Sequence, residues 1–156
     1  MSDANDNANV IIHPPIAWLL AFLAGLGLDW IRPLPFVPAT IPRAWLGGLV
    51  IALGVALGLW AIFTFRRAGT GPQTHKPTKA IVAGGPFRVT RNPIYTGMFI
   101  GQIGLAIAVD SLWVIAMLVP FFLLIRYGVV AREEAYLERK FGRVYLDYKA
   151  RTRRWI

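Results

Sequence analysis

Four apolar runs constrain what this chain can fold into. They cover residues 11–31, 44–65, 93–109 and 112–130. A helix needs about 20 predominantly apolar residues to cross a bilayer. A transmembrane barrel would instead show short segments of alternating polarity, and the sequence has none. We therefore predict an all-α integral membrane protein with four transmembrane helices, forming a single domain over residues 11–156 after a disordered tail at residues 1–10.

Prolines and one short polar turn mark the expected ends of these helices. Residues 110–111 alone separate the third and fourth runs, so these two helices should form a tight antiparallel hairpin. Pro120 predicts a kink in the fourth helix. Residues 32–43 contain four prolines and cannot form a regular helix. Gly54 and Gly58 have the small-residue spacing that lets helices approach closely, which we interpret as packing.

The distribution of positive charges predicts the orientation of the protein in the membrane. Fourteen of the 17 Lys and Arg residues lie in the loop between the second and third runs or after the fourth run. Because cytoplasmic loops carry an excess of positive charge, we expect both segments in the cytoplasm and, with four helices, the N-terminus there too. We expect an integral protein of the inner (cytoplasmic) membrane. Its net charge of +9 suits anionic lipid headgroups better than nucleic acid.

Residues 131–156 differ from the four runs because aromatic and charged side chains alternate in them. Tyr136, Phe141, Tyr145 and Tyr148 supply apolar anchors between the charges. This mixture predicts an amphipathic cytoplasmic helix that lies at the membrane surface. We interpret four residues near its end as lipid-facing anchors, with the alternative that one of them closes a binding pocket: Arg151, Arg153, Arg154 and Trp155.

The residue composition excludes several kinds of chemistry. The chain has no cysteine, which excludes disulfides, iron–sulfur clusters and thiolate nucleophiles. Two histidines, His13 and His75, are too few for a histidine-based metal site. We therefore expect no metal, and we interpret His75 as a loop residue without a catalytic role.

Polar residues gather at the start of the third run, in the stretch GGPFRVTRNPIYTGMF at residues 84–99. Pro93 suits the first position of a helix. Arg91 and Asn92 come just before it, and Tyr95 lies about one turn inside. We predict a rigid polar rim at the mouth of this helix. Pro86 fixes a turn before the rim. Behind the rim, Gly97, Gly101 and Gly104 form a helix face of small residues, which a neighbouring backbone can approach closely.

Ionisable residues mark the end of the fourth run, on the same side of the membrane. Arg126 and Glu133 are seven residues apart, close to two helical turns, and should therefore share a helix face. Glu134 should lie beside this face, one residue further round the helix. An arginine at the membrane edge is costly without a partner or a function. Because the hairpin turn is tight, this group and the rim at residues 91–95 should lie at a similar depth. Together they predict a pocket with two carboxylates, open to the cytosol.

A polar, partly cationic ligand from the cytosol suits such a pocket. Two carboxylates can hold an ammonium group or ribose hydroxyls. The N–H groups at a helix start can hold a carboxylate, and an aromatic ring can face a cation. S-adenosylmethionine meets these requirements, as do other ligands.

Two stretches of the chain resemble a known family. GGPFRVTRNPIYTG, then the tight hairpin, then REEAYLERKFGRVYLDYKARTRRWI look like the isoprenylcysteine carboxyl methyltransferase and phospholipid methyltransferase family, over residues 69–156. The resemblance implies a small helical membrane methyltransferase with S-adenosylmethionine in a cytosolic pocket. It implies cofactor-binding roles for the matching positions Pro86, Arg91, Asn92, Tyr95, Gly97, Glu133 and Glu134, with Pro93 and Leu137 also matching.

The resemblance has one departure at Asn92, where many members of the family carry histidine. Asparagine can still hydrogen-bond a cofactor, but it does not titrate near neutral pH, as histidine does. We therefore expect no acid–base role for Asn92.

The expected reaction is methyl transfer to a lipophilic or membrane-borne carboxylate, amine or thiol. A carboxylate or thiolate needs no base, so the enzyme would act by positioning and by excluding water. For an amine, Glu133 or Glu134 would take the proton. We interpret Glu133 and Arg126 as the catalytic residues, with Arg126 pairing with an anionic group of the acceptor. The alternatives for Arg126 are a structural salt bridge to Glu133 or snorkelling to the interface.

Two non-enzymatic classes stay open, a small transporter and a lipid-binding scaffold that uses the basic tail. A transporter would place an ionisable group near the bilayer midplane. The central parts of all four runs are apolar, which disfavours transport.

Overall fold

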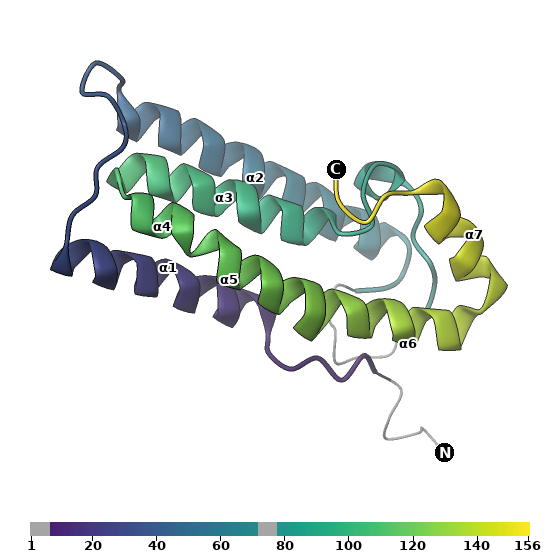
Figure 1. The fold of residues 1–156 in the computed structure, drawn as a ribbon. Helices are drawn as coiled ribbons and strands as arrows, with labels where there is room; N and C mark the ends of the chain where they lie inside the picture. The colour runs from purple at the N-terminus through teal and green to yellow at the C-terminus, as the bar shows by residue number, and fades with distance from the viewer. Residues whose placement is uncertain (1–6, 72–77) are drawn as a thin grey trace.

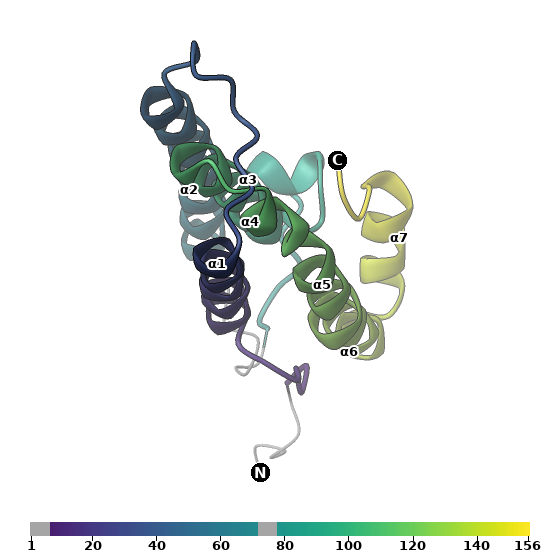
Figure 2. The same ribbon diagram turned by 60° about the vertical axis from the view of Figure 1, so that its left-hand side comes forward.

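Helix α3 (Pro93–Val109) lies at the centre of the molecule. It packs along α2 (Arg43–Arg67) on one side and against α4 (Leu112–Ala116) on the other, while α1 (Pro14–Ile31) covers α4 (Figures 1 and 2). This computed structural model describes residues 7–71 and 78–156, and within these ranges the regular secondary structure is helical without a strand. The prediction of an all-α protein is confirmed.

Backbone contact between α2 and α3 requires glycine. A Cβ atom added to Gly54 would lie 2.5 Å from the carbonyl oxygen of Gly97, and one added to Gly97 would lie 2.6 Å from that of Gly54. Gly47 and Gly104 make the same kind of contact two turns further along. A Cβ on Gly58 would meet no atom within 4 Å. The predicted packing role is confirmed for Gly54, whereas Gly58 contributes only its backbone, whose nitrogen would lie 3.2 Å from a Cβ added to Gly97. Gly47 makes a close contact that the predicted pair did not include.

The fourth run and the first part of the tail form one long helix, Leu112–Phe141. It comprises α4, α5 (Leu118–Leu123), the π-helical segment η2 (Leu124–Val130) and α6 (Ala131–Phe141). The break between α4 and α5 falls at Met117, one turn before Pro120, which lacks the N–H that would continue the helical hydrogen bonds. The helix is thus interrupted one turn before the proline at which a kink was predicted, and it does not end at residue 130.

Within residues 7–71 and 78–156, three helices are long and apolar enough to cross a membrane: Pro14–Ile31, Arg43–Arg67 and Leu112–Phe141. The third predicted span is α3, which is apolar and has 17 residues. Its bounds match the prediction because Pro93 starts the helix and Asp110, at φ 56° and ψ 50°, ends it in the left-handed conformation.

Asp110 also anchors the proline-rich stretch that precedes α2. One carboxylate oxygen accepts hydrogen bonds from the N–H groups of Phe36 and Val37, both at 2.8 Å. The other oxygen pairs with Arg43 Nη1 at 2.8 Å. These backbone hydrogen bonds hold the pKa of the Asp110 carboxyl below its ordinary value. The hairpin turn and the start of α2 are therefore fixed to each other.

The chain reverses direction after α6. Gly142 adopts a positive φ of 50°, and α7 (Arg143–Arg151) then leads residues 152–156 back toward the start of α3 (Figure 1). Our interpretation of Arg154 and Trp155 as lipid-facing anchors is wrong. Arg154 pairs with Glu134, and Trp155 packs against Phe99, with ring centroids 5.8 Å apart.

The segment before α1 lies against the π-helical segment. The Ile11 N–H donates to the carbonyl of Gly128 at 3.2 Å, and Arg132 Nη1 donates to the carbonyl of Asn9 at 3.0 Å. Ala8 is buried. Of the tail predicted to be disordered, residues 1–6 lie outside the described residues, as does His75 in the second loop.

Candidate functional site

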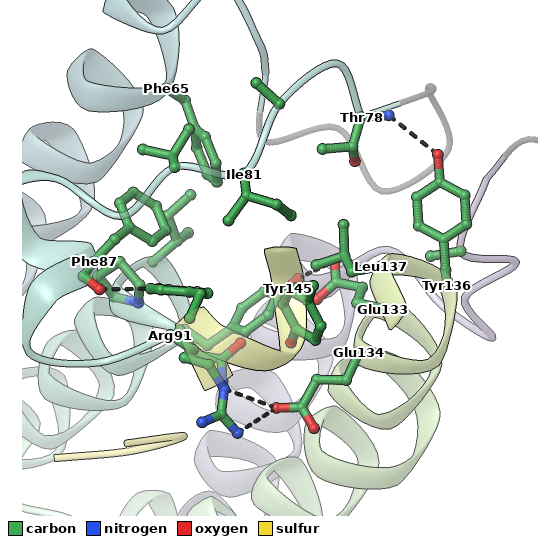
Figure 3. A pocket seen from close by; sticks show the side chains of 18 of the residues that line it. Phe65, Thr78, Ile81, Phe87, Arg91, Glu133, Glu134, Tyr136, Leu137 and Tyr145 are labelled. Carbon is green, nitrogen blue, oxygen red and sulfur yellow. Dashed lines mark hydrogen bonds and ion pairs between the residues drawn. The ribbon is translucent and has the colours of Figure 1, made fainter. Parts of the chain in front are cut away.

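A cavity lies where the start of α3 faces α6 and α7. Figure 3 shows that its side chains come from elements far apart in the sequence. The end of α2 and the loop after it form one wall through Phe65, Thr78 and Ile81. The 3-10 helix η1 (Gly85–Arg88) contributes Phe87. Besides Thr78, the polar part of the lining consists of Arg91, Asn92, Tyr95, Glu133, Glu134, Tyr136, Tyr145 and Tyr148.

Local hydrogen bonds fix the rim of this cavity. The N–H of Asn92 donates to Thr90 Oγ1 at 3.2 Å. The carbonyl of Asn92 accepts from the Thr96 N–H and from Thr96 Oγ1, both at 3.0 Å. Asn92 and Pro93 are buried. The turn into α3 is thus held from both sides, as the sequence predicted for a rigid rim.

Tyr95 and Glu133 join the two motifs that the sequence singled out. Tyr95 Oη donates a hydrogen bond to Glu133 Oε1 at 2.9 Å. Tyr95 is 8% exposed, so this bond lies away from bulk water. No residue in the described part of the chain hydrogen-bonds Glu133 Oε2. That oxygen is the carboxylate atom of the cavity available for a ligand.

The Glu134 carboxylate differs from that of Glu133 in its partners, because it forms ion pairs with two arginines. Arg91 contacts Oε1 through Nη2 at 2.8 Å and Nε at 3.2 Å. Arg154 contacts Oε2 through Nη2 at 2.6 Å and Oε1 through Nε at 3.0 Å. The Glu134 and Arg91 side chains are only 8% and 9% exposed. Glu134 thus balances two cations and keeps little capacity for a ligand.

The donors of the Arg91 guanidinium are also engaged in hydrogen bonds. Besides Glu134, its Nη1 donates to the carbonyls of Lys149, at 3.2 Å, and Thr152. Its guanidinium therefore ties the rim of α3 to the end of α7. This arrangement uses the fixed fork of donors that arginine offers.

Two tyrosines of α7 complete the wall of the cavity. Tyr148 Oη donates to the carbonyl of Phe87 at 2.9 Å. Burial raises the pKa of the Tyr148 phenol to about 12 and raises that of Tyr145 above its ordinary value. Both phenols stay protonated at neutral pH, so Tyr148 keeps the proton with which it donates to Phe87 and links η1 to α7.

The predicted site residues fall into two groups. Arg91, Asn92, Tyr95, Glu133 and Glu134 line the cavity. The other three do not belong to the lining: Pro86, Gly97 and Arg126.

Arg126 leaves the face of Glu133 because of the π-helix. Its guanidinium carbon lies 5.4 Å from the ring centroid of Tyr127, a side chain that is 62% exposed. In a π-helix the hydrogen bonds join residues five apart, so each residue turns the chain by less than in an α-helix. Seven residues across η2 (Leu124–Val130) therefore do not complete two turns.

Sequence reasoning missed Tyr145 and Tyr148 as residues of the site, and it gave Arg154 only as one of four residues that could close a pocket. The tyrosines were expected at the lipid surface, and Arg154 among the basic anchors. The spacing of the two tyrosines carried a signal, because residues three apart lie on one face of a helix. No comparable pattern in the sequence indicates that the chain returns to the start of α3 after α7.

Comparison with known proteins places these features in a family. The profile described as phospholipid methyltransferase matches residues 42–144. The chain belongs to this family. The match includes both the rim at the start of α3 and the Glu133–Glu134 pair of the phospholipid methyltransferase fold, whereas Tyr145, Tyr148 and Arg154 follow its last matched residue.

One curated relative aligns with part of the chain. It is an uncharacterized protein of Haemophilus influenzae, 53% identical over 36 residues, which are 23% of this chain. The aligned region spans 57% of that relative's length. No solved structure matches the chain.

Proposed function

We propose that this protein transfers a methyl group from S-adenosylmethionine to a lipophilic acceptor at the cytoplasmic face of the membrane. The Tyr95–Glu133 hydrogen bond is the observation that carries this proposal. It brings the two family motifs, 38 residues apart in sequence, to one cavity. Membership of the phospholipid methyltransferase family supports the reaction class.

The chemistry of the cavity suits S-adenosylmethionine. Glu133 Oε2 offers a carboxylate oxygen for an ammonium group or ribose hydroxyls. The first N–H groups of α3 lack intrahelical partners and suit a carboxylate. Aromatic rings at Phe65 and Phe87 give the wall apolar surface for an adenine ring. When bound, the cofactor would supply an electrophilic methyl group on its sulfonium.

The residues of the chain then have distinct roles. Tyr95 fixes the Glu133 carboxylate by donating to Oε1, while Asn92 lines the cavity without titrating. For an amine acceptor, Glu133 is the base that takes the proton, because both oxygens of Glu134 are already paired with arginines. For a carboxylate or thiolate acceptor, the cavity acts by orienting the acceptor and excluding water.

We place α3 as a fourth membrane span with α1, α2 and the long helix. It packs along α2 through backbone contacts, and its 17 predominantly apolar residues reach the lower limit for spanning. Both termini and the basic loop then lie in the cytoplasm. The cavity opens at that face, and the acceptor reaches it through the bilayer.

We assign Arg126 to the acceptor, outside the donor cavity. It lies half-buried on the long helix beside the exposed Tyr127. This position, near the membrane edge, suits a phosphate or carboxylate of a lipid headgroup. A phospholipid-like acceptor, which the family supports, would present such a group.

The direct test is calorimetric titration of S-adenosylhomocysteine into the detergent-purified protein. We expect micromolar binding, lost in both Tyr95→Phe and Glu133→Gln. Asp147→Asn is the matched control, because it also neutralises an acidic residue of the tail, and Asp147 is half-exposed and pairs with Arg143 of its own helix, away from the cavity lining. Absence of binding to folded parent protein, in detergent and in nanodiscs, would refute the donor site. The two non-enzymatic alternatives, a small transporter and a lipid-binding scaffold, would then be favoured.

A further inference from the structure

Residues 152–156 lie across the entry to α3, although the family match ends at residue 144. The N–H of Arg91 donates to the carbonyl of Arg153 at 2.8 Å. Thr90 Oγ1 and Asn92 Nδ2 both donate to the carbonyl of Arg154, at 3.1 and 2.9 Å. The C-terminal segment therefore bonds three consecutive residues of the rim.

Arg154 adds a side-chain contact from the same segment. Its guanidinium makes two bonds to Glu134, which also accepts two from Arg91. The two arginines carry like charges and share one carboxylate. Paired donors of this type fix geometry as well as charge. The position of Arg91, and with it the rim, thus depends on how Arg154 holds Glu134.

Trp155 anchors the segment at its far end. Its ring lies against Phe99 of α3 and Phe122 of α5, with centroids 5.8 and 5.4 Å away. The two helices of the hairpin are thereby joined by the residue that follows Arg154. Contacts of this kind add to the apolar area that the ring buries.

We propose that Arg154 is a positioning residue for the donor site proposed above and that residues 152–156 form a clasp. The clasp holds Arg91, Asn92 and Glu134 in the arrangement that leaves Glu133 free for the donor. Arg154 does not line the cavity, so it acts through Arg91 and Glu134. Donor affinity is therefore set partly by the last five residues of the chain.

Three variants of the full chain test this role. Arg154→Ala removes both bonds to Glu134, while Arg154→Lys keeps the charge without the paired donors. Arg153→Ala is the matched control, since Arg153 has an exposed side chain and contributes to the rim only through its backbone. The two measurements are the Kd for S-adenosylhomocysteine and hydrogen exchange of the backbone amides over residues 88–98.

We expect Arg154→Ala to raise the Kd roughly 10- to 100-fold, the effect of a small misplacement of binding groups. The Kd of Arg154→Lys should lie between those of Arg154→Ala and the parent, and the Kd of Arg153→Ala should equal that of the parent. Exchange should become faster at residues 88–98 and stay unchanged in α2. If Arg154→Ala does not fold, Arg154→Lys carries the test, because it retains the positive charge.

A Kd for Arg154→Ala within about twofold of the parent, with unchanged exchange at the rim, would overturn the clasp. Equal effects of Arg153→Ala and Arg154→Ala would also overturn it, by showing a general charge effect. If the parent does not bind S-adenosylhomocysteine, the donor site itself fails. The exchange measurement then still decides whether Arg154 holds the rim.

Discussion

The contact between α2 and α3 makes a quantitative prediction for Gly54→Ala. The added Cβ would lie 2.5 Å from the carbonyl oxygen of Gly97 and 2.7 Å from the N–H nitrogen of Gly101. Both are backbone atoms and cannot rotate away. The helices must separate by roughly 1 Å to restore ordinary contact distances. Overpacking of this kind costs up to about 3 kcal/mol, and replacing a helical glycine returns about 1 kcal/mol.

We therefore expect Gly54→Ala to lower the free energy of unfolding by about 2 kcal/mol. For a chain of this size, the Tm would fall by about 4–8 °C. Thermal unfolding of the detergent-purified protein, followed by circular dichroism, measures this shift. Because α3 carries Tyr95, we also expect weaker binding of S-adenosylhomocysteine.

Gly58→Ala is the control on the same helix, because its Cβ would meet no atom within 4 Å. Its Tm should stay the same or rise by about 2 °C, from the gain in helix propensity. A loss of stability in Gly58→Ala equal to that in Gly54→Ala would refute the reasoning. It would mean that glycines of α2 are needed for a reason other than the space for a Cβ between the helices.

Three further predictions concern charged and aromatic residues. Glu134→Gln should destabilise the protein by about 3 kcal/mol, more than Glu133→Gln does, because it leaves Arg91 and Arg154 without their shared carboxylate; chemical unfolding compares the two. Trp155→Ala should cost about 3 kcal/mol, whereas Trp155→Phe should cost less, because the buried Trp155 Nε1 has no hydrogen-bond partner among the described residues; thermal unfolding of both variants checks this. The pKa of Asp110 is lowered from 3.8, so its stabilising effect is present above that pH and is lost as the pH falls through the folded-state pKa. The Tm of the parent should therefore fall on acidification below about pH 4, while Asp110→Asn should be less stable at pH 7 and show a smaller acid-induced fall.

The sequence predicted α3 and the meeting of the two motifs because local signals determined both. Pro93 and Asp110 mark the ends of α3 by their own backbone preferences. A two-residue turn forces the following helix back along it, which brings Glu133 to Tyr95. Neither inference needed a distant contact.

The features that escaped prediction depend on contacts that a local pattern does not contain. Charges after residue 130 indicated the end of the helix, but Glu134 finds its partners in Arg91 and Arg154 and the helix continues. Arg126 lies off the predicted face because η2 changes the helical phase, and apolar spacing does not reveal a π-helix. The return of residues 152–156 likewise depends on the rim that they contact.

The length of the helix Leu112–Phe141 ties the cavity to bilayer thickness. Thirty residues at 1.5 Å per residue span about 45 Å, beyond the roughly 30 Å hydrocarbon core. Its partner α3 spans about 26 Å. In the four-span arrangement that we propose, the excess length is α6, the charged part of the helix that carries Glu133. The thickness of the bilayer around the protein would therefore set how far Glu133 and the cavity stand from the hydrocarbon core.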